Sequence, residues 1–286
     1  MQRPKFNREV VQRAGFGTLT LMAVVTVAPI LGVIAYIVAQ GAPAISAEFL
    51  IGFPREGMRA GGILPAIVGT LYLTAGTALF SVPLGIAAAI YLAEYSVDNV
   101  ATRSIRIAII NLAGIPSVVY GLFGLGLFVL FLGLGTSILA ASLTLSIMTL
   151  PVIISTSEEA LRSVPQAFRT VSISLGATRW QTIRRIVLKE ALPGILTGVI
   201  LGLERAAGET APILFTGAAF FLPRLPGSPL DATMALPYHL FVISTQVPEM
   251  PVKFQYGTAL VLLAFVLTMN VIATVIRSRA RAKRQW

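Results

Sequence analysis

Three charged residues interrupt a stretch of the sequence that is otherwise apolar. Glu204, Arg205 and Glu209 lie within a run from residue 193 to residue 217, whose length suits a membrane-spanning helix. An arginine at the centre of a bilayer costs about 2.5–3.5 kcal/mol, so such a side chain faces a bundle interior or a water-filled path. Arg205 lies twelve residues from either end of the run, and Glu209 follows four residues later on the same helix face. The spacing predicts an ion pair near the middle of the membrane.

Two interpretations of this pair remain open. A guanidinium presents a fixed fork of donors and a charge that does not titrate, which suits a tetrahedral oxyanion. Glu209 would hold Arg205 when no anion is present and would keep the site from trapping its ion, since a conducting site must also release. Glu204, about 100° around the helix, would reach another helix, and Thr210 completes the predicted substrate pathway. The alternative is a structural salt bridge that fixes the helix in its bundle.

The composition leaves little material for enzyme chemistry. The 286-residue chain has no cysteine and a single histidine, His239, which excludes thiolate ligands, a cysteine nucleophile and a multi-histidine metal centre. No G-x-x-x-x-G-K-[ST] string is present, so the chain has no P-loop for ATP phosphates. We expect a transport subunit without catalytic residues, a metal or a cofactor of its own, and ATP would be used by a partner subunit.

Long charge-free stretches indicate a membrane protein. Hydrophobic residues make up 56% of the chain and charged residues 12%, against about 25% charged in soluble domains. About 20 apolar residues cross a bilayer core of about 30 Å as a helix. We predict six such helices, at residues 16–39, 63–93, 107–132, 137–157, 193–217 and 256–276. The expected fold class is all-α and polytopic, with one transmembrane domain over residues 1–286.

The basic residues orient the chain. If both termini are cytoplasmic, 17 of the 22 lysines and arginines lie inside, four lie outside and Arg205 lies in the membrane. This distribution obeys the positive-inside rule. The net charge of +10 therefore reflects topology rather than nucleic acid binding. The first apolar run has about 24 residues, longer than the roughly 7–15 of a signal peptide, which favours a retained anchor over a cleaved signal.

Prolines lie inside several of the expected helices. Pro116 falls in the third helix and Pro212 in the fifth, and each removes a backbone hydrogen bond. Membrane bundles tolerate such interruptions because neighbouring groups satisfy the freed carbonyls. We interpret these two residues as candidate hinges, with simple packing as the alternative.

The long cytoplasmic loop, residues 158–190, is amphipathic. Its pattern predicts a helix from Pro165 to Leu175, a turn at Gly176 and a second helix from Thr178 to Leu188. Such a hairpin on the basic side of a membrane suits docking to a cytosolic partner. An interfacial helix lying on acidic lipid is the alternative.

Part of this loop resembles the EAA loop of binding-protein-dependent ABC importer permeases, whose pattern is E-A-A, three residues, G, nine residues and I-x-L-P. Gly176, Ile186 and Leu188 match, whereas Thr170-Val-Ser172 stands for E-A-A and Lys189 for the proline. The resemblance implies a coupling helix in a cleft of an ATPase subunit. The residues it assigns to coupling are Arg169, Thr170, Val171, Ser172, Leu175, Gly176 and Ala177.

Four longer strings are similar to the PstA-type permeases of phosphate ABC importers. They are Ala66–Thr70, Ser81–Tyr95, Gly114–Gly124 and Arg205–Pro212. The resemblance implies a MetI-like, type I importer fold over about residues 66–275 with both termini inside, in the inner membrane of a prokaryote. It also implies that Arg205 and Glu209 are needed for phosphate passage.

The resemblance further implies a set of partners. These are a homologous PstC-type permease, two PstB-type ATP-binding subunits, a PstS-type phosphate-binding protein and the lipid bilayer. Residues 217–255 are the expected surface for the binding protein, with lipid-facing lining as the alternative. Other functions stay open: a permease for molybdate or sulfate, an ion-coupled secondary transporter, and a membrane-embedded enzyme for which the sequence offers few groups.

Overall fold

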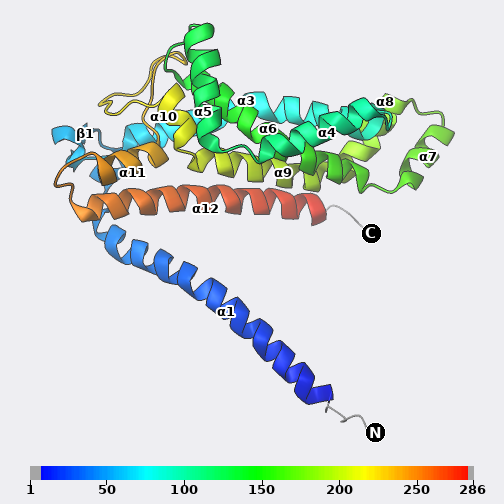
Figure 1. Ribbon diagram of the computed structural model, residues 1–286, viewed down its shortest axis with the longest axis horizontal. Helices are drawn as coiled ribbons and strands as arrows, with labels where there is room; N and C mark the ends of the chain where they lie inside the picture. Colours follow the sequence, from blue (N-terminus) through cyan, green and yellow to red (C-terminus); the bar gives the residue numbers. More distant parts are fainter. Residues whose placement is uncertain (1–7, 283–286) are drawn as a thin grey trace.

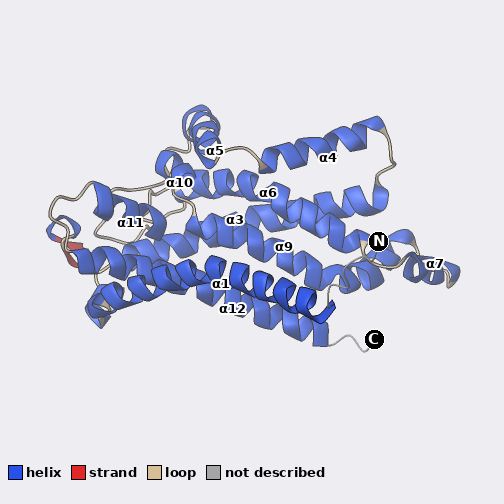
Figure 2. Ribbon diagram, turned by 60° about the horizontal axis from the view of Figure 1, so that its bottom comes forward, coloured by secondary structure: helices blue, strands red, loops and turns tan. Residues whose placement is uncertain are grey.

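The computed structural model describes residues 8–282, and within this range the chain is helical apart from loops and two short strands (Figure 2). The strands β1 (Pro54–Arg55) and β2 (Ala60–Gly61) pair antiparallel at one end of the molecule. Arg3, Lys5 and Lys283, which contribute to the predicted orientation, lie outside the described residues. The expected all-α fold class is confirmed.

The helices follow one another with short connections. In chain order they are α1 (Arg8–Gly41), η1 (Ala42–Ala44), α2 (Ala47–Ile51), η2 (Glu56–Met58), α3 (Leu64–Ile90), η3 (Tyr91–Tyr95), α4 (Val100–Ala113), α5 (Ser117–Gly124), η4 (Leu125–Phe131), α6 (Ile138–Arg162), α7 (Gln166–Ser174), α8 (Arg179–Thr182), η5 (Ile183–Val187), α9 (Leu188–Gly208), α10 (Ala211–Thr216), α11 (Leu236–Thr245) and α12 (Val252–Ala282). The segments η3, η4 and η5 are π-helical and continue their neighbours, whereas η1 and η2 are short 3₁₀ turns.

Five helical stretches among residues 8–282 are long and apolar enough to cross a membrane. They are Gln12–Ala44, Leu64–Tyr95, Ile138–Arg162, Arg179–Gly208 and Val252–Arg279. A sixth span arises if α4 and the segment from α5 through η4 are taken together, although their axes meet at 102°. The structure therefore supports the predicted polytopic architecture.

The third predicted helix, residues 107–132, is wrong as a single rod. α4 ends at Ala113, Gly114 and Ile115 form a turn, and α5 begins after Pro116, whose ψ is 140°. Proline has no N–H to donate and pushes the residue before it away from helical angles. The chain therefore changes direction at the proline that was expected to be a hinge.

The fifth predicted helix, residues 193–217, is wrong at both ends. The helix begins earlier, at Arg179, and Pro193 lies inside it without interrupting it. It ends at Gly208, because Glu209 has extended backbone angles (φ −74°, ψ 139°), and α10 starts two residues later. Arg205 therefore lies in the last turn of α9 rather than at mid-helix. The negative end of the helix dipole favours a cation there.

The core of the bundle consists of α3, α6 and α9, which pack closely through small residues. A Cβ at Gly198 of α9 would lie 1.8 Å from Thr156 Oγ1 of α6, and Gly76 of α3 is similarly close to Ser142. Small residues of this kind let membrane helices approach. Several buried hydroxyls are satisfied within their own helix: Thr77 Oγ1, for example, donates to a carbonyl four residues earlier, at 2.7 Å.

The helix α1 leaves this core and extends away from it (Figure 1). It contacts α12 near its end, where the rings of Tyr36 and Tyr256 pack edge to face with their centres 5.4 Å apart. Most apolar side chains of α1 from residue 12 onward are exposed, as at Leu21 and Val33. In Figure 1 the start of α1, the end of α12 and α7 lie toward one end of the molecule, with β1 and α11 at the other. This arrangement agrees with both termini lying on the same side as the predicted cytoplasmic loop, residues 158–190, called the docking loop below.

Candidate functional site

The charged pair predicted from the sequence is formed. Arg205 Nε donates to Glu209 Oε1 at 3.1 Å. The Arg205 side chain is 35% exposed and that of Glu209 16%, so the guanidinium is accessible from one side. Among residues 8–282 the two terminal nitrogens of Arg205 have no hydrogen-bond partner. The fork of donors is therefore available to an anion.

The pair lies where two interrupted helices meet. Glu209 forms the break between α9 and α10, and α10 packs on α5, which follows the break at Pro116. A Cβ at Gly121 of α5 would lie 3.0 Å from the Pro212 Cα. Pro212 therefore lies in this contact, which a side chain at position 121 would obstruct, and Pro116 precedes the helix that makes it.

Tyr120 belongs to the same region, although sequence analysis did not single it out. Its hydroxyl donates to the carbonyl of Leu112 at 2.7 Å and so ties α5 to α4 across the bend. The string Gly114–Gly124 contains Tyr120, but nothing in the string says which of its residues joins the two helices.

Glu204 and Thr210 have different surroundings. Glu204 interacts with Asn270 of α12, as expected for a residue turned away from Arg205, and its Oε1 is buried without a hydrogen-bond partner among the described residues. The carbonyl of Thr210 accepts the N–H of Leu214 and so starts α10. The structure thus brings Arg205 and Glu209 together, with Thr210 beside them and Glu204 on another face.

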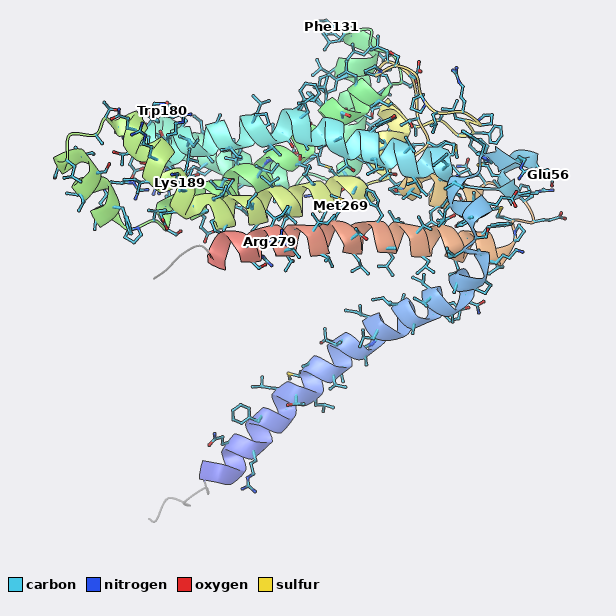
Figure 3. The ribbon with its side chains drawn as sticks, turned by 180° about the vertical axis from the view of Figure 1, so that it is seen from behind. Glu56, Phe131, Trp180, Lys189, Met269 and Arg279 are labelled. Carbon is cyan, nitrogen blue, oxygen red and sulfur yellow. The ribbon has the colours of Figure 1, made fainter. Side chains whose placement is uncertain are left out.

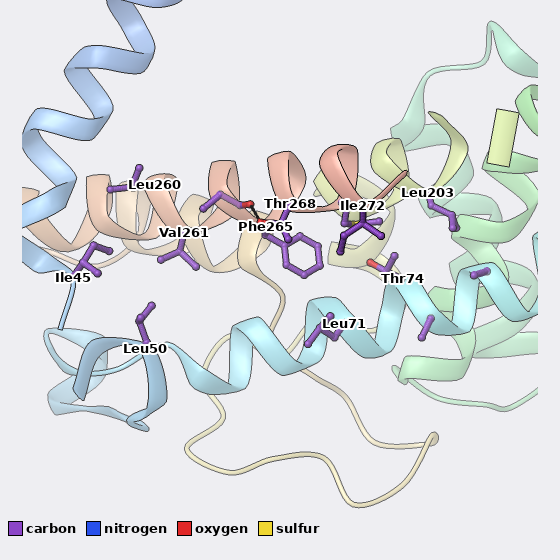
Figure 4. A pocket seen from close by; sticks show the side chains of 14 residues that line it. Ile45, Leu50, Leu71, Thr74, Leu203, Leu260, Val261, Phe265, Thr268 and Ile272 are labelled. Atoms are coloured by element: carbon purple, nitrogen blue, oxygen red, sulfur yellow. Dashed lines mark hydrogen bonds between the residues drawn. The ribbon is translucent and has the colours of Figure 1, made fainter. Parts of the chain in front are cut away.

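A pocket of about 700 Å³ lies between α3 and α12 and does not coincide with the charged pair (Figure 4). Its lining includes Leu71, Phe265 and Ile272, and none of its fourteen residues is charged. Such a surface suits hydrocarbon rather than an anion. We therefore assign ion chemistry to Arg205 and not to this pocket.

The predicted helix–glycine–helix pattern of the cytoplasmic loop is present. α7 begins after Pro165, and Gly176 has φ 86°, a left-handed conformation that favours glycine. Thr178 and Gln181 then form a capping box at the start of α8. The second helix does not stop at Leu188, because α8, η5 and α9 form one continuous stretch.

The residues assigned to coupling divide into two groups. Thr170, Val171 and Leu175 are exposed, and Leu175 most of all at 83%. Arg169 is instead half-buried in an ion pair with Glu94 at 2.6 Å, and Ser172 is buried. Gly176 is exposed at the turn, and Ala177 is half-buried. The exposed group remains a prediction for partner contact, whereas Arg169 and Ser172 hold the loop together from inside.

This loop and the strand-containing end lie far apart. Figure 3 places Trp180 of α8 and Glu56 of η2 at opposite ends of the bundle. Trp180 is half exposed, on the same end as the exposed apolar side chains of α7. An ATPase on one face and a binding protein on the other would therefore not compete for surface.

The segment 217–255 is not all surface. Within it α11 packs into the bundle, where the N–H of Leu236 donates to Thr70 Oγ1 at 2.8 Å. His239 lies in α11, is 3% exposed, and its Nδ1 has no partner among the described residues. Burial lowers the pKa of His239 to about 4. The exposed part of the segment, including Phe220 and Leu230, remains the expected surface for a binding protein.

Residues 81–282 match the family model described as "binding-protein-dependent transport system inner membrane component". The chain belongs to this family. It is 33% identical to the probable ABC transporter permease protein YqgI of Bacillus subtilis, over 93% of this chain and 95% of that protein. It is 37% identical to the phosphate transport system permease protein PstA 1 of Mycobacterium tuberculosis, over 79% of this chain and 73% of that protein.

The fold is also known from solved structures. A chain of a bacterial ABC transporter that imports the acidic polysaccharide alginate superposes with a TM-score of 0.65, covering 96% of this chain and 99% of that one. Its sequence identity is 16%, so this likeness concerns the fold alone. The chain is a multi-pass membrane permease subunit of an ABC importer with a MetI-like fold.

Proposed function

We propose that this chain is the membrane-spanning subunit of an ATP-driven importer of inorganic phosphate, located in the cytoplasmic membrane of a prokaryote. The observation that carries the proposal is the half-exposed guanidinium of Arg205, held by one carboxylate where two interrupted helices meet. The similarity to relatives named PstA supports phosphate over other cargo.

The charged pair explains how an oxyanion passes without being trapped. A phosphate entering the site offers two oxygens to the guanidinium fork, a bidentate geometry that arginine favours. Glu209 lies 3.1 Å from the same guanidinium and competes for it. When the phosphate leaves, the pair forms again. Weak net binding of this kind allows release, as conduction requires.

The other subunits supply what this chain lacks. Two PstB-type subunits would bind and hydrolyse ATP and dock on the exposed residues of α7, among them Val171 and Leu175. A PstC-type permease would provide the other half of the pathway, and a PstS-type protein would deliver phosphate at the end that holds β1. Unequal ATP affinity of the inward- and outward-facing states would bias transport.

A permease for molybdate or sulfate is the second candidate, because these tetrahedral oxyanions satisfy the same guanidinium fork. The relative YqgI carries only the name of a probable ABC permease and is consistent with either cargo. An ion-coupled secondary transporter has no need for a docking loop. Membership of the importer family argues against it.

Uptake of radiolabelled phosphate into liposomes tests the proposal. The vesicles contain this chain with its partner permease and ATPase, with ATP inside and the binding protein outside. We expect uptake that requires both ATP and the binding protein, and that is lost in Arg205→Gln. Arg279→Gln, which changes an exposed arginine near the end of α12, is the control and should transport normally.

Each other outcome identifies the step at fault. Uptake that survives in Arg205→Gln would make the Arg205–Glu209 pair a structural salt bridge. Uptake of molybdate or sulfate in place of phosphate would keep the importer and change its cargo. Loss of complex assembly in Arg205→Gln would also count against a transport role, and co-purification of the subunits measures it.

A further inference from the structure

The C-terminal end of α3 is held by arginines from other helices. A helix end leaves its last carbonyl groups without partners. Here Arg106 of α4 donates to the carbonyl of Leu92 at 3.1 Å, and Arg179 of α8 donates to the carbonyl of Glu94. The guanidinium of Arg179 also lies 4.9 Å from the centre of the Tyr95 ring. The π-helical turn η3 is therefore fixed from outside.

Glu94 joins this helix end to the docking loop. Its Oε1 accepts from Arg169 Nη2 of α7 at 2.6 Å, and Arg169 Nε lies 3.2 and 3.3 Å from its two carboxylate oxygens. The same guanidinium donates to the carbonyls of Leu161 and Val164, at the end of α6, at 2.9 and 2.7 Å. The carboxylate is buried and the guanidinium is largely covered, at 7% and 12% side-chain exposure. One arginine thus connects α7 to α3 and α6 together.

The hairpin of α7 and α8 is itself a unit. Ser172 Oγ of α7 and Thr182 Oγ1 of α8 are buried and lie 2.8 Å apart. Beneath them an apolar cluster joins α3, α6, η5 and α9. Its buried members are Ala89, Leu161, Val164, Val187, Ala191 and Ile195. If the hairpin moves while the end of α3 stays in place, the contacts of Glu94 must therefore break.

We infer that Glu94 is a positioning residue that makes α3 move with the α7–α8 hairpin, so that a displacement by the ATPase enters the bundle through α3 as well as through α9. The inference rests on the proposed docking of an ATPase on α7. A buried ion pair contributes little net stability relative to apolar side chains, because both charges lose water. The forked guanidinium of Arg169 instead fixes the orientation of α7 relative to the end of α3.

The exposed pair Glu48–Arg55, at the other end of the molecule, provides a matched control. Both of its side chains are 64% exposed, and it connects α2 only to the neighbouring strand. Glu48→Gln therefore removes the same charge as Glu94→Gln without touching the hairpin.

A distance measurement tests the inference without relying on the cargo. The chain has no cysteine, so spin labels can be placed at Tyr91→Cys in η3 and Ser174→Cys at the end of α7, which are both exposed and lie outside the residues proposed to meet the ATPase. In the assembled complex we expect the distance between the two spin labels to be the same with and without ATP. A shift of about 5 Å, the rise of one helical turn, would overturn the inference. With Glu94→Gln added, we expect the distance to change on ATP binding.

A transport measurement tests the consequence. Glu94→Gln should lower the phosphate imported per ATP hydrolysed about tenfold, within the range of coupling energies that single residues carry. Co-purification of Glu94→Gln with the ATPase should be unchanged, and Glu48→Gln should leave the spin-label distance as it is in the wild-type protein. A normal ratio in an assembled Glu94→Gln complex would overturn the inference.

Two further outcomes are separable. If Glu94→Gln fails to assemble, Arg169→Lys takes its place, because lysine keeps the charge but cannot make all the contacts of the fork; normal coupling in that variant would refute the positioning role. If the wild-type complex imports no phosphate, the proposed cargo is wrong. The spin-label distance still decides the role of Glu94, since it needs only ATP.

Discussion

The contact between Gly198 and Thr156 yields a quantitative prediction about the core that carries Arg205. A Cβ at position 198 would lie 1.8 Å from Thr156 Oγ1 and 2.8 Å from its Cβ, so α9 and α6 must separate in Gly198→Ala. Overpacking of this severity costs about 3 kcal/mol, and the better helix propensity of alanine returns about 1 kcal/mol. We expect a net loss of about 2 kcal/mol.

An exchange of sizes across the contact sharpens the test. Thr156→Gly removes both close atoms, and Thr156 Oγ1 donates to Val152 and Ile153 of its own helix, so no bond between helices is lost. In the double variant Thr156→Gly/Gly198→Ala the strain disappears, which gives a coupling energy of about 3 kcal/mol between the two substitutions. The double variant should therefore lose far less stability than the two single variants lose when their losses are added.

Thermal unfolding of the purified chain in detergent measures these differences. At about 2 °C per kcal/mol, Gly198→Ala should unfold about 4 °C below wild type. Gly32→Ala is the control, because Gly32 lies in α1 with nothing within 4 Å, and it should unfold at or above the wild-type temperature. An unchanged midpoint in Gly198→Ala, or additive effects in the double variant, would refute this account of the core.

Two further predictions concern the docking turn and the buried histidine. Gly176→Leu puts a side chain at φ 86°, which costs about 1–2 kcal/mol, so phosphate uptake per ATP hydrolysed should fall. Gly133→Leu, strained in the same way at φ 67° but outside the docking loop, should leave that ratio unchanged, and equal effects would contradict the docking role. For His239, the folded pKa of about 4 lies below the unfolded value, so the unfolded chain binds more protons and stability falls from about pH 6.5 to pH 4, by up to about 3 kcal/mol. His239→Leu should flatten this dependence in thermal unfolding at several pH values, and an equal fall in that variant would show that other groups cause it.

The membrane spans could be predicted from the sequence because they depend on composition alone. Which helices break could not. Pro83, Pro151 and Pro193 lie inside helices that continue past them, whereas the chain bends at Pro116. A proline interrupts a membrane helix only where neighbouring groups fail to satisfy the freed carbonyls, and those neighbours come from distant parts of the chain. The break at Glu209 has Gly208 and Pro212 beside it. A similar pair, Pro193 and Gly194, lies inside α9 without interrupting it.

The candidate site shows the same limit. The pairing of Arg205 with Glu209 followed from a spacing of four residues, which is local information. The pairing of Glu94 with Arg169 joins residues 75 positions apart, so no spacing rule reaches it. In the sequence Glu94 has the position of an ordinary acidic residue at the end of a span. Arg169 was assigned to partner contact from the resemblance of its loop to the EAA loop. Its pairing with Glu94 depends on how α7 folds back on the end of α3, which the sequence of the loop does not show.

The corrected course of the fifth span bears on how transport is driven. Residues 179–208 form one helical stretch of 30 residues, about 45 Å long, which begins in the docking hairpin and ends just after Arg205. The predicted helices, from Thr178 to Leu188 and over residues 193–217, left a gap between the hairpin and the ion pair. In the structure the chain is continuous there, and the break follows at Glu209. A displacement of α8 would therefore carry Arg205 with it, while Glu209 lies on the break. The ion pair spans this break, so the same displacement that moves the hairpin would draw Arg205 away from Glu209 and free its Nε for an anion as well.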